Sequence, residues 1–152
     1  MLKTQIKHFS NLSAKEFHDI LQLRINVFIV EQNCPYEEID GKDLKSFHLF
    51  TSDETGKIVG VTRILPQNIS YPEVSIGRVA SDSNQRGKGI GQEIMKKSIE
   101  FIHSEFGNVP IRISAQKYLL KFYESFGFVS TGKEYLEDDI PHVEMLRGNS
   151  EM

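Results

Sequence analysis

The chain has 152 residues, a hydrophobic fraction of 39%, a net charge of −3 and one cysteine. This length suits a single domain covering residues 1–152, and the acidic balance argues against a nucleic-acid partner, which would need a basic face. With no apolar run near the ~18 residues of a membrane span, no signal-peptide core and no possible internal disulfide, the sequence predicts a cytoplasmic protein without a membrane partner.

The first half of the chain predicts a strand, a helix and a hairpin. Residues 4–9 are a modest strand candidate, and Ser13 followed by Glu16 is the capping box that begins a helix reaching about residue 30. Polar residues 31–43 predict a loop. Residues 47–52 and 57–65 predict two strands joined by a turn, and the second is apolar on both faces, which is typical of a central strand.

The second half predicts strands and helices in alternation. The sequence indicates a strand at 73–80, a helix ending near 106, a strand at 111–115, a short helix at 116–126, and strands at 128–131 and 142–146. This order predicts a mixed α/β (α+β) sheet with helices on both faces and a central strand–helix–strand crossover. Ligands of such sheets bind at the carboxyl ends of the strands.

A glycine turn separates the fourth strand from the second helix. Glycines alternate with other residues at positions 87, 89 and 91, so the backbone can turn its amides toward a ligand beside the positive end of the helix. This arrangement favours a bound anion such as a pyrophosphate. The spacing fits neither the P-loop nor the dinucleotide fingerprint. A surface turn without any ligand is the alternative interpretation.

Two motifs carry a resemblance to a known family. Arg86, Gly89 and Gly91 match an RxxGxG element, and Tyr123 to Phe128 match a YxxxGF element. With these motifs the chain resembles the GNAT superfamily of acetyl-CoA-dependent N-acetyltransferases, whose sheet is mostly antiparallel. Residues 23–32, 34–43, 115–119 and 137–145 are most similar to its ElaA-like group. Ser81 and Ser83 replace a valine and a proline of many relatives, and Asp139 stands where a glycine is expected.

The resemblance implies a site for acetyl-CoA as acetyl donor and no metal. Backbone amides of the glycine turn would bind the pyrophosphate, the fourth strand would pair with the pantetheine arm, and a bulge there would aim an amide at the thioester carbonyl. Tyr123 would protonate the departing thiolate, whereas spacing alone makes it a core tyrosine. The implied cofactor-binding residues are Val79, Ala80, Ser81, Arg86, Gly87, Lys88, Gly89, Ile90 and Gly91.

The base that takes a proton from the acceptor amine stays open at this stage. Glu31 follows the first helix and is otherwise a solvated carboxylate, His48 is otherwise a structural histidine, and His142 and Glu144 lie in the ElaA-like stretch. A water relay is the remaining alternative.

Charged residues near the expected acceptor side allow two interpretations. Carboxylates in two loops either attract a cationic acceptor or are simply solvated: Glu37, Glu38, Asp40, Asp43, Glu137, Asp138 and Asp139. Arg63 and Arg78 lie on central strands and need partners, which are these acids or an acceptor carboxylate. Cys34 has no neighbouring base in the sequence and is a poor nucleophile candidate.

The resulting hypothesis is an enzyme that transfers acetyl from acetyl-CoA to a primary amine of a small molecule or peptide, by direct attack in a ternary complex. A non-catalytic acyl-CoA sensor and an interaction protein with an unoccupied glycine turn are the alternatives. Strands near the C-terminus suggest that a homodimer is possible.

Overall fold

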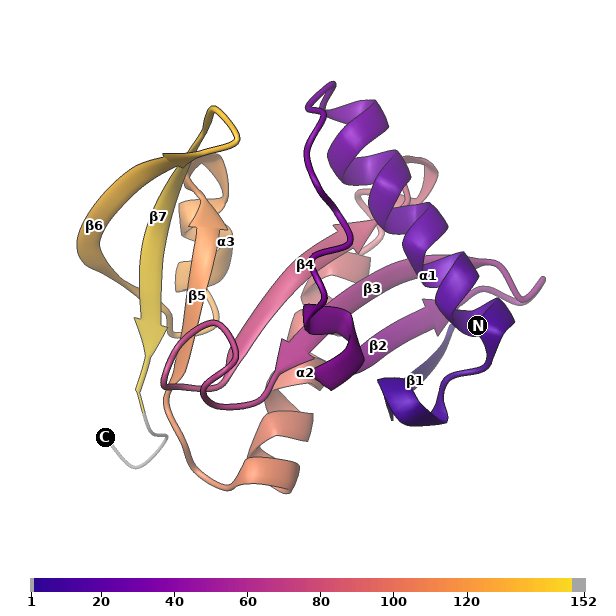
Figure 1. The fold of residues 1–152 in the computed structure, drawn as a ribbon, viewed down its shortest axis with the longest axis horizontal. Helices are drawn as coiled ribbons and strands as arrows, with labels where there is room; N and C mark the ends of the chain where they lie inside the picture. The colour runs from indigo at the N-terminus through magenta and orange to yellow at the C-terminus, as the bar shows by residue number, and fades with distance from the viewer. Residues whose placement is uncertain (1, 149–152) are drawn as a thin grey trace.

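The computed structural model describes residues 2–148, which form two sheets and three α-helices (Figure 1). The strands are β1 Lys3–His8, β2 Phe47–Ser52, β3 Ile58–Leu65, β4 Ser75–Ser81, β5 Ile111–Gln116, β6 Val129–Glu137 and β7 Ile140–Arg147. The α-helices are α1 Ala14–Ile25, α2 Ile90–Phe106 and α3 Leu120–Glu124. None of the helices in residues 2–148 has the length and apolar character needed to span a bilayer.

The first sheet is antiparallel and has the order β1-β2-β3-β4. Every residue of β3 is buried, which confirms the prediction of a central strand. Helix α1 covers one face, where Ile20 and Leu23 belong to one apolar cluster with Phe50 and Val61. Helix α2 covers the other face through a separate cluster made of Leu49, Val59, Ile90 and Ile94. The sheet is therefore held between two helices.

The second sheet is also antiparallel, with the order β5-β7-β6. Most of residues 132–141, which lie between the two predicted C-terminal strands, instead belong to two long strands joined by Asp138 and Asp139. Both residues have positive φ, 51° and 64°, which is the conformation of a two-residue hairpin turn. Aspartate tolerates this region better than most residues, so Asp139 can stand where a glycine was expected. Strand β6 extends far beyond the predicted 128–131. The prediction was too short because an exposed edge strand has little apolar patterning in its sequence.

The two sheets meet at a single parallel bridge. Val74 pairs with Ile111, and the Arg112 amide donates a hydrogen bond of 3.0 Å to the Val74 carbonyl. Beyond this point β4 and β5 diverge, and α2 connects them across the back of the opening (Figure 1). The predicted mixed fold and its central crossover are thus confirmed, with the parallel pairing reduced to one residue pair.

The first helix ends earlier than predicted. Its capping box is present, with Ser13 and Glu16 bonded reciprocally. After Ile25, however, Asn26–Glu31 winds as a π-helix, and the Cys34 amide donates to the Ile29 carbonyl at 3.1 Å. Apolar spacing cannot distinguish this winding from an α-helix over so few residues. The π-helical segment matters because its residues line the opening between the sheets.

Candidate active site

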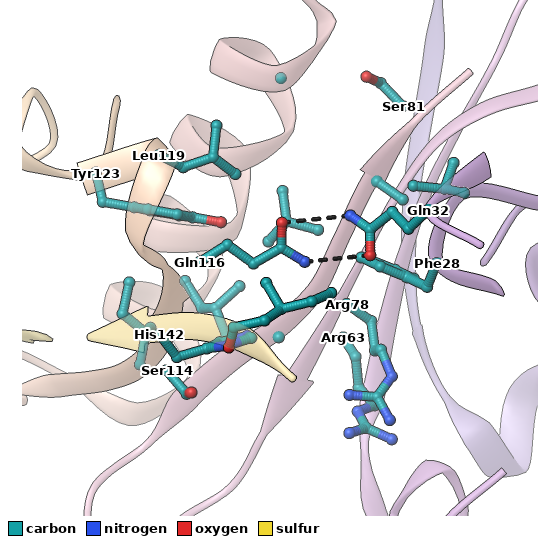
Figure 2. A pocket seen from close by; sticks show the side chains of 18 of the residues that line it. Phe28, Gln32, Arg63, Arg78, Ser81, Ser114, Gln116, Leu119, Tyr123 and His142 are labelled. Atoms are coloured by element: carbon teal, nitrogen blue, oxygen red, sulfur yellow. Dashed lines mark hydrogen bonds between the residues drawn. The ribbon is translucent and has the colours of Figure 1, made fainter. Parts of the chain in front are cut away.

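A cleft of about 1120 Å³ occupies the space where β4 and β5 diverge. One wall comes from the π-helical segment, the loop that follows it and β4. The opposite wall comes from β5, α3 and the β6–β7 hairpin. Figure 2 shows Phe28, Arg63 and Arg78 on the first side and Tyr123, Ser114 and His142 on the second. Segments more than eighty residues apart in the sequence therefore share one site.

The glycine turn lies at one end of this cleft. Gly87 and Gly89 have φ values of +87° and +80°, and nothing lies within 4 Å of the position that a Cβ would take at either residue. The amides of Gly89, Ile90 and Gly91 donate no hydrogen bond within the described chain. They sit at the N-terminus of a 17-residue helix, whose dipole is positive there. An open backbone surface with free amides suits a diphosphate.

Strand β4 carries the expected bulge. Val61 pairs with Ala80 but Arg63 pairs with Gly77, so two β4 residues oppose Thr62 alone. Within the bulge, the backbone of Arg78 adopts a positive φ of +51°, which is unfavourable for a non-glycine residue. The bulge lies immediately before Ala80, and past Val74 the outer edge of β4 has no strand beside it in the described residues. An extended ligand could therefore pair with this edge.

Tyr123 belongs to the core and to the cleft at the same time. The residue is 7% exposed, and its ring makes edge contacts with Phe122 and Phe128. Figure 2 shows its hydroxyl directed into the cleft, where the described chain offers it no hydrogen-bond partner. Burial, with a smaller effect of Tyr118, raises the pKa of Tyr123, so the phenol stays protonated at neutral pH. The interpretation of Tyr123 as a core tyrosine is confirmed, and its hydroxyl also lines the cleft.

Side chains of the glycine turn point to protein partners. The Arg86 guanidinium pairs with the Glu31 carboxylate and donates to the Ser81 carbonyl at 2.9 Å. The Lys88 ammonium lies 3.4 Å from the Gln85 side-chain oxygen. Glu31, a candidate base, is therefore occupied by an ion pair at the glycine end of the cleft.

The other candidate bases lie in three different settings. His48 is fully buried away from the cleft, where its Nε2–H donates to the Asp43 carbonyl at 3.0 Å and burial lowers the pKa of its ring. The structural interpretation of His48 is confirmed. Glu144 does not line the cleft and accepts hydrogen bonds from Arg112 at 3.0 Å and Thr131 at 2.9 Å. His142 does line the cleft and is 6% exposed.

The acidic loop after the π-helical segment folds inward rather than into solvent. Glu38 and Asp43 are 4% and 2% exposed, so neither long-range attraction nor solvation describes them. Both pair with Arg24, which is 1% exposed and lies 2.9 Å from the Asp43 carboxylate. Sequence reasoning missed the role of Arg24, although an arginine on the apolar face of a helix is itself a signal of a buried partner.

The two strand arginines complete this network. Arg63 lies 2.9 Å from Asp40 and 3.1 Å from Asp43, and Arg78 lies 2.9 Å from Glu38. Burial alone would raise the pKa of Asp40, but hydrogen bonds from Arg63 and a backbone amide outweigh it and lower the pKa to about 2. Three arginines and three carboxylates balance one another. Of the two kinds of partner considered for the strand arginines, the structure shows the loop acids.

Two contacts join the walls across the cleft, and neither was predicted. Gln32 and Gln116 exchange side-chain amide hydrogen bonds of 3.3 and 3.4 Å, drawn as dashed lines in Figure 2. The Cys34 thiol donates to the Asp138 carbonyl at 3.2 Å. Cys34 thus has a positional role between the loop and the hairpin turn.

Comparison with known proteins agrees with this geometry. The model of the acetyltransferase (GNAT) domain matches residues 12–147. A UPF0039 protein of Schizosaccharomyces pombe is 42% identical over 91% of this chain and 92% of its own length. Protein ElaA of Escherichia coli is 40% identical over 97% of both chains, and its crystal structure has a TM-score of 0.90, covering 97% of this chain and 99% of that chain.

A second solved structure is equally similar. The crystal structure of an acyl-CoA N-acyltransferase from Pseudomonas aeruginosa has a TM-score of 0.92 and 39% identity, covering 97% of this chain and all of that one. The region matched by the family model contains every strand except β1, and it includes the glycine turn and Tyr123. The chain therefore belongs to the GNAT acetyltransferase family.

Proposed function

We propose that this protein transfers the acetyl group of acetyl-CoA to a primary amine by direct attack in a ternary complex. Membership of the GNAT family supports acyl transfer from an acyl-CoA, and the similar Pseudomonas aeruginosa protein is described as an acyl-CoA N-acyltransferase. The observation that carries the finer proposal is the unpartnered Tyr123 hydroxyl, which faces the same cleft as the free amides of the glycine turn.

In this proposal the backbone holds the donor. Amides from Arg86 to Gly91 bind the diphosphate of CoA, and the free edge of β4 at Val79 and Ser81 pairs with the pantetheine arm. The bulge turns the amide of Val79 or Ala80 toward the thioester carbonyl, where it stabilises negative charge as the amine attacks. Because these contacts use main-chain groups, the replacements at Ser81 and Ser83 leave them unaffected.

Tyr123 acts as the general acid for the departing sulfur. As the carbon–sulfur bond breaks, its hydroxyl donates a proton to the thiolate, so CoA leaves as a neutral thiol with a pKa of about 8.5. The phenol regains its proton from solvent. A tyrosine suits this step because it remains protonated until a strong base forms beside it.

Turnover by the Tyr123→Phe variant tests the proposal. Release of free thiol from acetyl-CoA is measured with a panel of polyamines, amino acids and lysine-containing peptides, and the acetylated product is identified by mass spectrometry. The variant should lose roughly 10²- to 10⁴-fold in kcat while calorimetry gives an unchanged CoA affinity. The control is Val129→Thr, a change of similar size at a side chain that is 66% exposed and does not line the cleft, which should leave kcat unchanged.

Two results would overturn the enzyme assignment in different ways. Wild-type protein that binds CoA but acetylates no amine of the panel would instead support an acyl-CoA sensor. Absence of CoA binding would support the alternative of an interaction protein whose glycines form only a turn.

The proposal also covers the acceptor, the location and the oligomeric state. The acceptor is a small molecule or peptide, the location is cytoplasmic, and the exposed edge of β6 is available to a second copy of the chain.

A further inference from the structure

Amide formation also requires a group that takes a proton from the amine, on the opposite side of the carbonyl from the sulfur. We propose that His142 is this base, with Nε2 as the accepting atom. The inference rests on the proposed acyl transfer and deepens it by assigning the acceptor side of the cleft. Four observations carry it: the face of the sheet, the tautomer, the neighbours of the ring and the occupation of the other candidates.

The second sheet separates His142 from Tyr123. Val143 belongs to the core cluster that also contains Tyr123 and Phe128. Since successive side chains of a strand point to opposite faces, His142 projects away from that cluster. It pairs in register with Gln116, whose side chain crosses the cleft to Gln32. An acyl carbon held where the sheets diverge would therefore have the phenol on one side and the imidazole on the other.

Local hydrogen bonding fixes the tautomer of the ring. His142 Nδ1 lies 2.7 Å from the Ile140 carbonyl oxygen, which can only accept, so Nδ1 carries the hydrogen. In the neutral ring Nε2 then has a free lone pair. Tyr135 stacks on the imidazole at a centroid distance of 6.1 Å and an angle of 18°, which holds its orientation. The ring is thus preset as a proton acceptor at Nε2.

A carboxylate lies beside the nitrogen that would accept the proton. The Glu137 carboxylate of β6 lies 3.6 Å from Nε2, close enough to neutralise an imidazolium. Two uncharged polar side chains lie in register with or stack on the ring, namely Gln116 of β5 and Tyr135, whose hydroxyl donates to Ser114, and Asp138 of the hairpin turn lines the same wall of the cleft. From the opposite wall, the exposed carboxylate of Glu37 also lines the cleft. No cationic side chain is paired with Glu137 among the described residues.

The other titratable candidates are already engaged. Glu31 is ion-paired with Arg86, Glu144 is held by Arg112 away from the cleft, and His48 is buried beneath α1. Among these four side chains, His142 alone combines a position in the cleft with a proton-accepting atom that no cation holds.

The proton balance of the step is simple. The unprotonated amine forms a carbon–nitrogen bond to the thioester carbonyl carbon, and the carbon–sulfur bond breaks. The proton lost by the amine nitrogen moves to Nε2 of His142, while Tyr123 protonates the sulfur. Imidazolium returns its proton to solvent, and solvent restores the phenol. Acetyl-CoA and the amine are thereby converted to the acetamide and CoA thiol with no further reactant.

The test is the pH dependence of kcat/KM for His142→Gln, measured with acetyl-CoA and the amine of the panel that reacts fastest. We expect a loss of about 10²-fold or more near neutral pH and disappearance of the acid limb of the profile. Calorimetric CoA affinity should not change, because no proposed CoA contact is made by this side chain. The control is His18→Gln on the solvent face of α1, where the side chain is 71% exposed and kcat/KM should be unaltered.

Glu137→Gln provides a second variant that leaves the imidazole in place. It should lower kcat/KM while the CoA affinity stays unchanged, because the proton-bearing ring loses the carboxylate beside it. A wild-type-like rate and profile in His142→Gln would overturn the base assignment while leaving the acyl transfer intact. Failure of the proposed function would appear differently, as absence of amine acetylation by the wild-type protein.

Discussion

Arg24 links α1 to the loop that forms one wall of the cleft. Its guanidinium is buried against Glu38 and Asp43, and the same two carboxylates also bind the strand arginines Arg63 and Arg78. Desolvating two charges costs several kcal/mol, which their attraction offsets only while every partner is present. The loop is therefore held in its place by charge pairing rather than by apolar packing.

Replacing Arg24 by leucine tests this dependence. Two buried carboxylates would lose a partner, and we expect the free energy of unfolding to fall by roughly 3–5 kcal/mol. Urea denaturation monitored by circular dichroism measures the change. The control is Lys15→Ala, which removes an ion pair at a side chain that is 83% exposed and should change stability by less than about 1 kcal/mol. Equal effects in the two variants would contradict the role of the buried pair.

At the level of elements, β3 and α2 are fitted together at Gly60. A Cβ at this residue would lie 2.8 Å from Cγ2 of Ile90 and 3.3 Å from Cγ2 of Ile94. Both contacts involve β-branched side chains of a helix, which have little rotamer freedom to move away. The absent side chain at Gly60 therefore sets how closely the first turn of α2 approaches the sheet.

The variant Gly60→Ala should push α2 outward at its N-terminus. Overpacking of this kind costs about 1–3 kcal/mol, and the displaced amides of the glycine turn should bind CoA more weakly. Chemical denaturation and calorimetry measure the two effects. For stability the control is Gly77→Ala, where the added Cβ would meet only the Leu65 side chain at 4.0 Å. An unchanged CoA affinity in Gly60→Ala would contradict the expectation that the packing of α2 against β3 positions the CoA-binding amides.

Local patterns predicted the elements that have a clear period or a clear stop. The capping box at Ser13, the buried strand β3 and the glycine after α2 each leave a signature within a few residues. The missed features depend on distant partners or on weak local signals. Nothing near Gln32 indicates its bond to Gln116, and the polar edge strand β6 lacks the apolar alternation that identifies a half-buried strand.

At the scale of the whole molecule, the two sheets share one bridge and are otherwise joined by side chains and α2. The cleft lies between them, so a ligand that touches both walls adds contacts that the free protein lacks. Binding to the folded state alone stabilises it by mass action. If the cleft binds the donor as proposed, donor binding stabilises the contact between the two sheets.

CoA should accordingly raise the thermal midpoint of the protein. At about 100 times its Kd a ligand adds about 2.7 kcal/mol to the free energy of unfolding. Differential scanning calorimetry with and without CoA measures the shift. In Gly89→Ala the new methyl group would project into the open space beside the free amides, at a φ of +80°, and the shift should shrink. An equal CoA-induced rise of the thermal midpoint in the wild type and in Gly89→Ala would indicate that CoA does not bind at the glycine turn.

The π-helical winding of Asn26–Glu31 has an evolutionary consequence. A π turn contains one more residue than an α turn, so losing a single residue there would restore the α-helix and keep the flanking segments in place. Phe28 and Glu31 line the cleft from within this turn, and such a deletion would rotate side chains of the turn by roughly 100° about the helix axis. A single-codon insertion or deletion there would therefore reshape this wall of the cleft without moving the segments on either side.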